Sequence, residues 1–532
     1  MRTLLERTLN RVWLLRNSRK SMVMGLLASL MAIALLAAAC GGDDEEKDSA
    51  PTGSETPKYG GSIKVGLLAD HTGFDAPLLA GVPDIQILQH TNDTLIMRHT
   101  RTLELVPMLA TSWEPSADLM SWTFHLRQGV KFSHGKEFKA EDVKFTLDRL
   151  FEVDSPLAGV LDSIKETVIV DDYTVRFDLN TPNAFLPDLI LRYHAQMTPS
   201  DVDPTRFATE TFGTGPYTLE EFVVGEFAVL KKRDDYFLEG LPYLDEIIFV
   251  YLPDPTTRAE ALKAGTIDMI YALETENVPA LEQHPDTRVS VATGAAYMNL
   301  AMNVTEPPFD NILVRKALQA ATNRELILQA SQFGLGGIAY DHPITPDDPV
   351  FNPSCKPPDY DPELAKSLLA QAGYPDGIEL TLYTSSAGAA MVPMATAFQQ
   401  SAKAAGIEIT ISVMPEDVYW SDGWMVKPFT TVWWGGRIPD EAFSIVYKSD
   451  AAWNESFYKN PEVDRLILKA RGEPNLADRK VTYGELQCLL IDEVPRIIPV
   501  FRPLFIGLRN DVKDVEANWE DLLYLREGWL DR

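Results

Sequence analysis

A strand–helix–strand pattern within residues 377–414 places the strongest constraint on the fold. Residues 377–383 and 406–414 are rich in aliphatic and β-branched side chains, which favours two strands. Between them, Met391 to Ala405 has the length and composition of a helix. A β-α-β unit of this kind predicts an α/β lobe.

The length of the chain predicts more than one lobe. It has 532 residues, of which 45% are hydrophobic, and a single core rarely grows to that size. The 77 acidic residues outnumber the 48 basic ones, so the surface repels polyanions. This charge excludes nucleic acid and anionic membrane as main partners.

Residues 429–443 form the most distinctive stretch. Phe429 to Trp434 is aromatic and β-branched, which predicts a buried strand. Gly435 and Gly436 follow, where another backbone can come close, and Arg437 adds a planar fork of donors. The stretch is either a ligand platform or a core strand with a tight turn that leaves Arg437 in solvent. Because successive strand residues face opposite ways, only one of the two tryptophans, Trp433 and Trp434, can easily face a ligand.

The sequence shows no pattern of catalysis or metal binding. It contains no His-Glu-x-x-His, no Gly-x-Ser-x-Gly and no cysteine spacing typical of zinc sites. We therefore predict a protein without metal, without cofactor and without enzymatic activity, with a secreted hydrolase as the alternative. Cys355 and Cys488 either form a disulfide or are two separate buried thiols.

The N-terminus has the organisation of a bacterial lipoprotein signal. Met22 to Ala39 is an uncharged run of 18 residues that ends in small residues before Cys40. This pattern predicts removal of residues 1–39 and a lipid on Cys40, the new N-terminus. The alternative is an uncleaved transmembrane anchor, because 18 residues is close to the minimum span. The basic residues that precede the run are Arg2, Arg7, Arg11, Arg16, Arg19 and Lys20.

Both alternatives place the remaining chain outside the cytoplasmic membrane, in the periplasm or at the cell surface. Loss of residues 1–39 removes six basic residues and one acidic residue, which takes the formal net charge from −29 to −34. Residues 40–58 have no apolar run, so we predict a flexible tether between the lipid and the folded body.

Residues 121–151 are predicted to form a strand from Ser121, two turns, and a helix from Ala140 with acids in its first turn. Five further segments follow in order, namely residues 213–217 with 241–249, residues 253–268, residues 303–324, residues 360–374 and residues 460–465. Together these six segments, within residues 60–510, resemble the family-5 extracellular solute-binding proteins, the peptide-binding components of ABC importers.

The resemblance implies the architecture. It implies a two-lobe, periplasmic-binding-protein-like α/β fold of the large peptide-binder type, with a hinge and an interlobe cleft. Residues 59–295 and 500–532 would form the large lobe and residues 296–499 the second lobe, with crossings near residues 295 and 500. The implied partners are a small solute, an ABC permease and its ATPase, and we expect the protein to be a monomer.

The resemblance also implies where the ligand lies. The strand from Val432 to Arg437 would run beside the ligand backbone, with Trp433 and Gly435 offering main-chain hydrogen bonds. A kinked loop at Gly81, Val82 and Pro83, which leads into a helix predicted from Ile85 to Met97, would approach from the opposite lobe.

One position departs from the family's pattern. Well-known peptide binders hold the peptide's α-ammonium with an aspartate shortly after the tryptophan, where this chain has Arg437. Either Asp440, the nearest acid, substitutes for it, or the ligand lacks a free amino end. Arg437 could instead pair with an anionic ligand or with a neighbouring carboxylate in a structural salt bridge.

The predicted function is a binding lipoprotein that captures a solute, most simply a peptide or a peptide-like molecule, and delivers it to an importer. The alternatives are a binder of a non-peptide, anionic or sugar solute, a secreted hydrolase, and a sensor or adhesion lipoprotein of the same fold.

Overall fold

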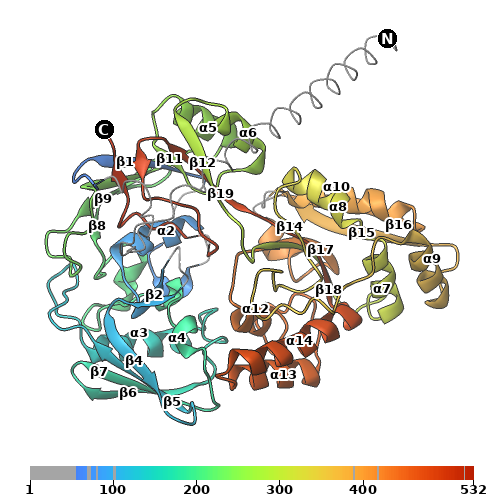
Figure 1. The fold of residues 1–532 in the computed structure, drawn as a ribbon, viewed down its shortest axis with the longest axis horizontal. Helices are drawn as coiled ribbons and strands as arrows, with labels where there is room; N and C mark the ends of the chain where they lie inside the picture. Colours follow the sequence, from blue (N-terminus) through green and yellow to red (C-terminus); the bar gives the residue numbers. More distant parts are fainter. Residues whose placement is uncertain are drawn as a thin grey trace, which may run out of the picture. The chain divides into compact units, whose positions relative to one another are not determined.

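The computed structural model describes residues 56–68, 73–79, 82–99, 104–386, 390–415, 418–520 and 522–532. The predicted signal, Cys40 and nearly all of the tether lie outside the described residues. Strands and helices are mixed throughout, and two large sheets organise them (Figure 1). Within the described residues, no helix combines the length and the apolarity that crossing a membrane would require.

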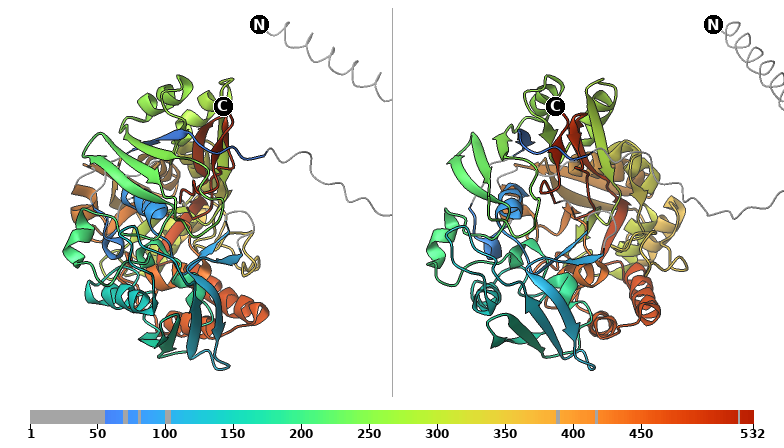
Figure 2. Two further views of the ribbon diagram at one scale, coloured as in Figure 1. Left: turned by 90° about the vertical axis from the view of Figure 1, so that its left-hand side faces the viewer. Right: turned by 60° about the vertical axis from the view of Figure 1, so that its left-hand side comes forward.

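A seven-stranded sheet contains the first strand, β1 (Ser62–Leu67). β1 runs parallel to β10 and β11, and the other pairs are antiparallel. Figure 2 shows the dark-red C-terminal strand β19 beside the green strands, far from it in sequence. The order across the sheet is β12 (Thr287–Ala292), β19 (Leu504–Arg509), β11 (Met269–Ile270), β1, β10 (Glu246–Tyr251), β9 (Phe227–Lys232) and β8 (Tyr217–Val223).

The helix α2 (Val82–Thr91), which packs against this sheet, corrects the prediction for this region. The loop predicted at Val82 and Pro83 is the first turn of the helix, where a proline lacks no needed N–H. The helix predicted to continue to Met97 ends at Thr91, and residues 96–98 form the strand β2 (Ile96–Arg98). Tertiary contacts determine where the helix ends. Gly213 and Gly215 pack so closely against the backbone of Thr91 and against Asn92 that a Cβ would not fit at either glycine.

A four-stranded sheet carries the first segment of the family resemblance. The strand predicted at Ser121 is β5 (Ser121–Leu126), and the predicted helix is α3 (Ala140–Glu152), so both predictions are confirmed. We call the described parts of residues 57–295 and 504–532, which carry this sheet and the seven-stranded sheet, the first lobe. The remaining strands of the four-stranded sheet are β4 (Ala110–Pro115), β7 (Thr174–Leu179) and β6 (Ile164–Asp171). The first lobe also contains the helices α4 (Leu186–Leu189), α5 (Pro255–Lys263) and α6 (Val278–Glu282).

A six-stranded sheet lies in residues 296–503, which we call the second lobe. The predicted β-α-β unit is confirmed: β15 (Ile378–Ser385) and β16 (Ile407–Met414) pair in parallel, and α10 (Met391–Lys403) connects them. The order across the sheet is β14 (Gly337–Ile338), β18 (Arg496–Phe501), β13 (Tyr297–Met302), β17 (Phe429–Trp434), β15 and β16. Its other helices are α7 (Ile312–Ala320), α8 (Arg324–Gln332), α9 (Pro362–Gln371), α12 (Pro439–Val446), α13 (Pro461–Arg471) and α14 (Leu476–Glu493).

Two short connections carry the chain between the large sheets. The first joins β12 to β13 across residues 293–296, and the second joins β18 to β19 across Arg502 and Pro503. A short two-strand connection can act as a hinge, because few backbone angles have to change when the lobes move.

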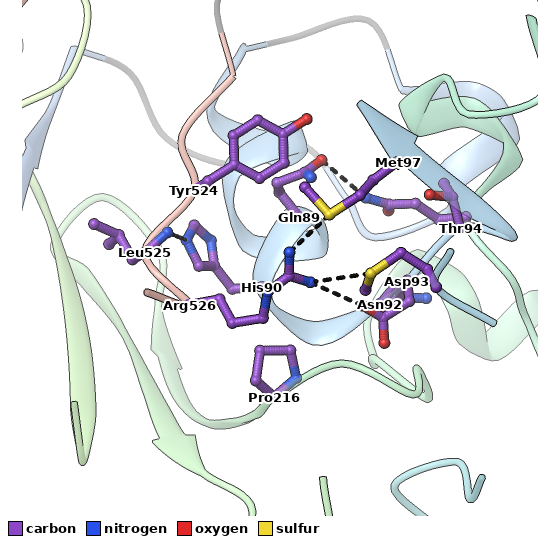
Figure 3. A pocket seen from close by; sticks show the side chains of 12 residues that line it. Gln89, His90, Asn92, Asp93, Thr94, Met97, Pro216, Tyr524, Leu525 and Arg526 are labelled. Atoms are coloured by element: carbon purple, nitrogen blue, oxygen red, sulfur yellow. Dashed lines mark hydrogen bonds and ion pairs between the residues drawn. The ribbon is translucent and has the colours of Figure 1, made fainter. Parts of the chain in front are cut away.

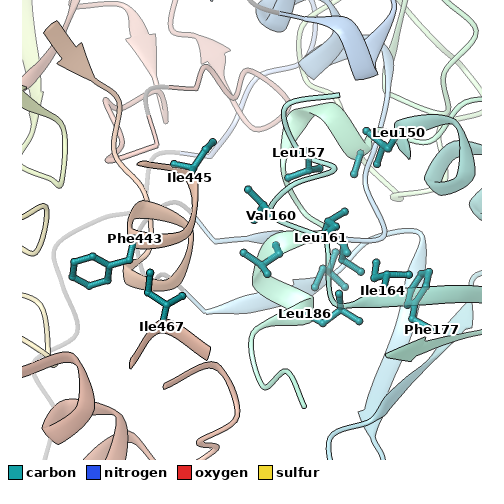
Figure 4. Close-up of a cluster of buried hydrophobic side chains, with 14 of the residues drawn as sticks. Leu150, Leu157, Val160, Leu161, Ile164, Phe177, Leu186, Phe443, Ile445 and Ile467 are labelled. Atoms are coloured by element: carbon teal, nitrogen blue, oxygen red, sulfur yellow. The ribbon is translucent and has the colours of Figure 1, made fainter. Parts of the chain in front are cut away.

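Apolar side chains from both lobes belong to one buried cluster. Figure 4 shows Leu157, Val160 and Leu161, from the turns after α3, facing Ile445 of α12. Ile467 of α13 belongs to the same cluster. The segment between α3 and β6 therefore contributes to the contact between the lobes.

Local signals fix both ends of α9 in the second lobe. Asp361 caps α9 by accepting hydrogen bonds from two backbone N–H groups, and Gly373 follows the helix with a φ of +97°. Cys355 and Cys488 are joined by a disulfide that ties the loop before α9 to α14.

Candidate functional site

The platform strand β17 leaves part of its edge open. It pairs with β13 along its whole length, from Phe429 to Trp434. On its other side, within the described residues, it pairs with β15 at the single position Thr430. The carbonyl of the next residue, Thr431, already accepts a hydrogen bond from the hydroxyl of Tyr419. Residues 432–434 are therefore the part of β17 with which another extended segment could pair on this side.

Trp434 belongs to the core. Its side chain is 6% exposed, and its indole N–H donates to Oε1 of Glu455 over 3.2 Å. The same carboxylate accepts from Trp424 (2.6 Å), Asn299 (2.8 Å) and Arg496 (2.7 Å). Four donors on one fully buried carboxylate fix the platform against the strands beside it.

Trp433 faces the other way, as strand alternation requires. Its ring is partly buried, and the guanidinium carbon of Arg502, in the connection between β18 and β19, lies 4.8 Å from the ring centre. Its indole Nε1 is buried without a hydrogen-bond partner among the described residues. Of the two tryptophans, Trp433 is thus the one with an unused donor.

The C-terminal segment of the first lobe packs against the glycines that follow β17. A Cβ placed on Gly436 would lie 2.1 Å from the carbonyl oxygen of Trp519, so no larger residue fits there without movement. Gly435 accepts a hydrogen bond from Nη1 of Arg437 over 3.0 Å. This is the point where the platform meets the other lobe.

Arg437 and Asp440 are both held by neighbouring groups. Arg437 lies over the ring of Trp434 at 5.0 Å, and its Nε lies 3.3 Å from Oε1 of Glu441. Asp440 is fully buried, and both of its oxygens lie within 3.3 Å of Nε of Arg471. Burial raises the pKa of Asp440, and Arg471 opposes that rise. The assignment of these two residues as ligand contacts stays a prediction.

Three residues at this place were missed by sequence reasoning. Arg192, which precedes the short helix at residues 193–195, lies 3.3 Å from Glu441 and 3.7 Å from Glu520. Glu441, in the first turn of α12, could have been found beside Asp440. Arg192 and Glu520 carry no local signal, because only the fold brings them together.

The opposite side of the predicted site is described in part. Gly81 lies outside the described residues, and Val82 is the first residue of α2. The ligand roles predicted for both remain predictions.

A small cavity lies beside α2, as Figure 3 shows. Its volume is about 30 Å³, which suits a single water molecule and not a peptide. His90 lines it, receives a hydrogen bond from the backbone N–H of Leu525 and contacts the carbonyl of Gln86. Burial lowers the pKa of His90 to about 4, so the imidazole is neutral at pH 7. The cavity is a structural feature of the first lobe.

No group of three or more histidine, cysteine, aspartate or glutamate side chains within the described residues is placed to hold a metal ion. The site built by β17, α12 and the C-terminal segment is instead one of aromatic rings, main-chain groups and ion pairs. Such a site suits the binding of an organic solute.

Comparisons with known proteins point in the same direction. Residues 104–455 match the family described as "Bacterial extracellular solute-binding proteins, family 5 Middle". The chain is 30% identical over 417 residues to the glutathione-binding protein GsiB of Pectobacterium atrosepticum, with 75% of this chain and 80% of the relative covered. It is 29% identical over 447 residues to heme-binding protein A of Haemophilus influenzae, with 77% and 81% covered.

A solved structure shares the fold. The periplasmic binding protein DppA of Helicobacter pylori, in complex with the peptide STSA, superposes with a TM-score of 0.82 at 27% identity. The superposition covers 89% of this chain and 99% of that one. The two-domain, periplasmic-binding-protein fold is therefore common to both chains.

Proposed function

Because the chain belongs to the bacterial extracellular solute-binding proteins of family 5, it is a substrate-binding component of an ABC importer and not an enzyme, and we propose that its solute is a peptide or a peptide-like molecule. The solute would be held in a cleft between the first lobe and the second lobe. The proposal concerns the class of solute and the place where it binds.

The partly paired edge of β17 carries the proposal. A peptide backbone that lies beside residues 432–434 would add a strand to the six-stranded sheet, with Trp433 facing the solute. The H. pylori protein, whose described ligand is a peptide, supports the same class of solute. Trp433, Gly435 and Arg437 would line the second-lobe side, and Gly81 and Val82 the first-lobe side.

The location follows in part from the family, whose members are extracellular, so the body of the chain lies outside the cytoplasm. We further propose that a lipid on Cys40 anchors the protein to the membrane and that residues 40–58 act as the tether. The cognate permease would then receive the solute from a protein that stays near the membrane.

A thermal-shift screen tests the proposed function. Peptide pools are added to the purified protein, and a pool present at 100 times its dissociation constant should stabilise the folded state by about 2.7 kcal/mol. Mass spectrometry should recover the bound peptide unchanged. Recovery of a cleaved peptide would favour the hydrolase alternative, and no shift with any peptide would remove the peptide proposal.

A pair of glycine variants then tests the place of binding. Gly436→Ala pushes a methyl group against Trp519, so the lobes cannot close fully and affinity for the peptide should fall at least tenfold. Gly159→Ala is the matched control, because a Cβ at Gly159 meets no atom within 4 Å. Equal affinities of the two variants would place the ligand elsewhere.

A further inference from the structure

Two buried carboxylates from different lobes share one arginine. Glu441 lies in the first turn of α12 in the second lobe, and Glu520 lies in the C-terminal segment of the first lobe. Arg192 lies 3.3 Å from Oε1 of Glu441 and 3.7 Å from Oε1 of Glu520. The three residues therefore join the two lobes beside Gly436 and Trp519, where the platform ends.

Each carboxylate has an oxygen that lacks a hydrogen bond. Glu441 is 3% exposed and Glu520 is 7% exposed, yet Oε2 of Glu441 and Oε1 of Glu520 have no hydrogen-bond partner among the described residues. The distance of 3.7 Å from Arg192 to Glu520 is too long for one. A buried acceptor without a donor costs about 1–3 kcal/mol, and more when it is charged. Neither oxygen therefore receives a hydrogen bond from the described residues, although Nε of Arg437, itself without a hydrogen-bond partner there, lies 3.3 Å from Oε1 of Glu441.

Among the described residues, groups of both charges already meet at this point. Glu441 has two arginines beside it, Arg192 and Arg437. The charge of Arg98 also reaches Glu520, while Arg98 itself is paired with Asp188. The described pairs thus bring three guanidinium groups to the three carboxylates Asp188, Glu441 and Glu520. An added ammonium group would leave an unmatched positive charge in a dry site, which is costly.

We propose that Glu441 and Glu520 form a subsite for an uncharged part of the solute that donates one hydrogen bond to each carboxylate, such as amide N–H or hydroxyl groups. The ligand end at this subsite carries no free ammonium. This inference rests on the proposed function and narrows its class of solute.

Matched pairs of probes test the subsite by calorimetry on the purified protein. One pair is a tripeptide pool with free amino ends and the same pool N-acetylated. The other is glucose and glucosamine, in which an ammonium group replaces one hydroxyl. In whichever of the two pairs binds, the uncharged probe (N-acetylated peptides or glucose) should bind at least tenfold more tightly than the charged probe (free peptides or glucosamine). Equal or tighter binding of the charged member overturns the inference.

Substitutions then assign the effect to the two carboxylates. Glu441→Gln and Glu520→Gln each place an amide donor where the solute donates, so each should weaken the neutral probe at least tenfold. Glu363→Gln is the control, because Glu363 is exposed on α9 and pairs only with Lys366 among the described residues. Unchanged affinity in both carboxylate variants overturns the inference.

The two proposals fail in different ways. If glucose binds more tightly than glucosamine while neither peptide form binds, the peptide proposal falls and the subsite stands. If free peptides bind more tightly than acetylated ones, the peptide proposal stands and the subsite falls. If none of the probes binds, both fall.

Discussion

Trp433 and Trp434 are adjacent in the strand β17, yet their side chains lie in different environments. Alternation along a strand predicts opposite faces, and the structure places Trp434 in the core and Trp433 beneath Arg502. The sequence could not say which of the two faces the core. That choice depends on Glu455, which is 21 residues away and accepts the indole N–H of Trp434.

Glu455 is predicted to be the main electrostatic support of the platform. Glu455→Ala would leave Arg496 fully buried without its carboxylate and would remove the acceptor of Trp424 and Trp434. We expect the free energy of unfolding to fall by about 3–5 kcal/mol. Urea titration followed by tryptophan fluorescence measures the change.

The control for this prediction is Glu462→Ala. Glu462 pairs with Arg465 on the exposed side of α13, so its loss should change stability by less than about 1 kcal/mol. If Glu455→Ala were no more destabilising than this control, the support assigned to Glu455 would be wrong.

At the scale of elements, α12 connects the platform to the contact between the lobes. The helix begins at Pro439, directly after the platform, and Asp440 in its first turn is paired with Arg471 of α13. Nη1 of Arg471 also donates to Asp162 of the first lobe over 2.9 Å, and Lys448 pairs with the same carboxylate. A chain of ion pairs therefore runs from the platform to the segment between α3 and β6.

Asp162→Asn is predicted to weaken solute binding without contact to the solute. The substitution removes the charge that holds Lys448 and Arg471 across the lobes, so the closed arrangement loses stability relative to the open one. We expect the dissociation constant to rise about five- to tenfold, in the lower range of coupling energies between sites. Calorimetry with the peptide from the screen measures it.

Asp178→Asn serves as the comparison for Asp162. Asp178 pairs with Arg176 on the surface of the four-stranded sheet, away from α12. Arg471 keeps Asp440 and Ser444 in the Asp162 variant, so the fold should be retained. Equal dissociation constants for the two variants would show that this ion pair does not influence closure.

At the scale of the whole molecule, two sheets from different parts of the chain are joined by two short connections. The disulfide between Cys355 and Cys488 lies within the second lobe and spans 133 residues of sequence. It limits the freedom of the unfolded chain more than a short loop would. It also ties a long loop to α14, so this lobe has a support that does not depend on the solute.

Reduction of the disulfide is predicted to lower the stability of the second lobe. We expect a loss of about 2–5 kcal/mol, seen as a lower unfolding temperature in dithiothreitol. The variant with both Cys355→Ser and Cys488→Ser should unfold at that lower temperature and should not respond to the reductant. An unfolding temperature of the native protein that stays the same under reduction would contradict the prediction.

The elements that could be predicted are those whose signals are local. The period of apolar residues and the strand–helix–strand pattern act within a few residues, so α3, α10, β15 and β17 follow from them. The end of α2 could not be predicted, because it depends on close packing against Gly213 and Gly215, which lie about 120 residues later in the chain.

The amino-acid order was sufficient for the family, the α/β class and the strand β17, since each of these depends on short patterns that keep their meaning in any fold. The ion pairs of Arg192 with Glu441 and Glu520, and the burial of Asp440 behind the platform, required the folded chain. Charges and close contacts act through space, and the residues that meet at this site are separated by up to 328 positions in the chain, so only folding could bring them to one place.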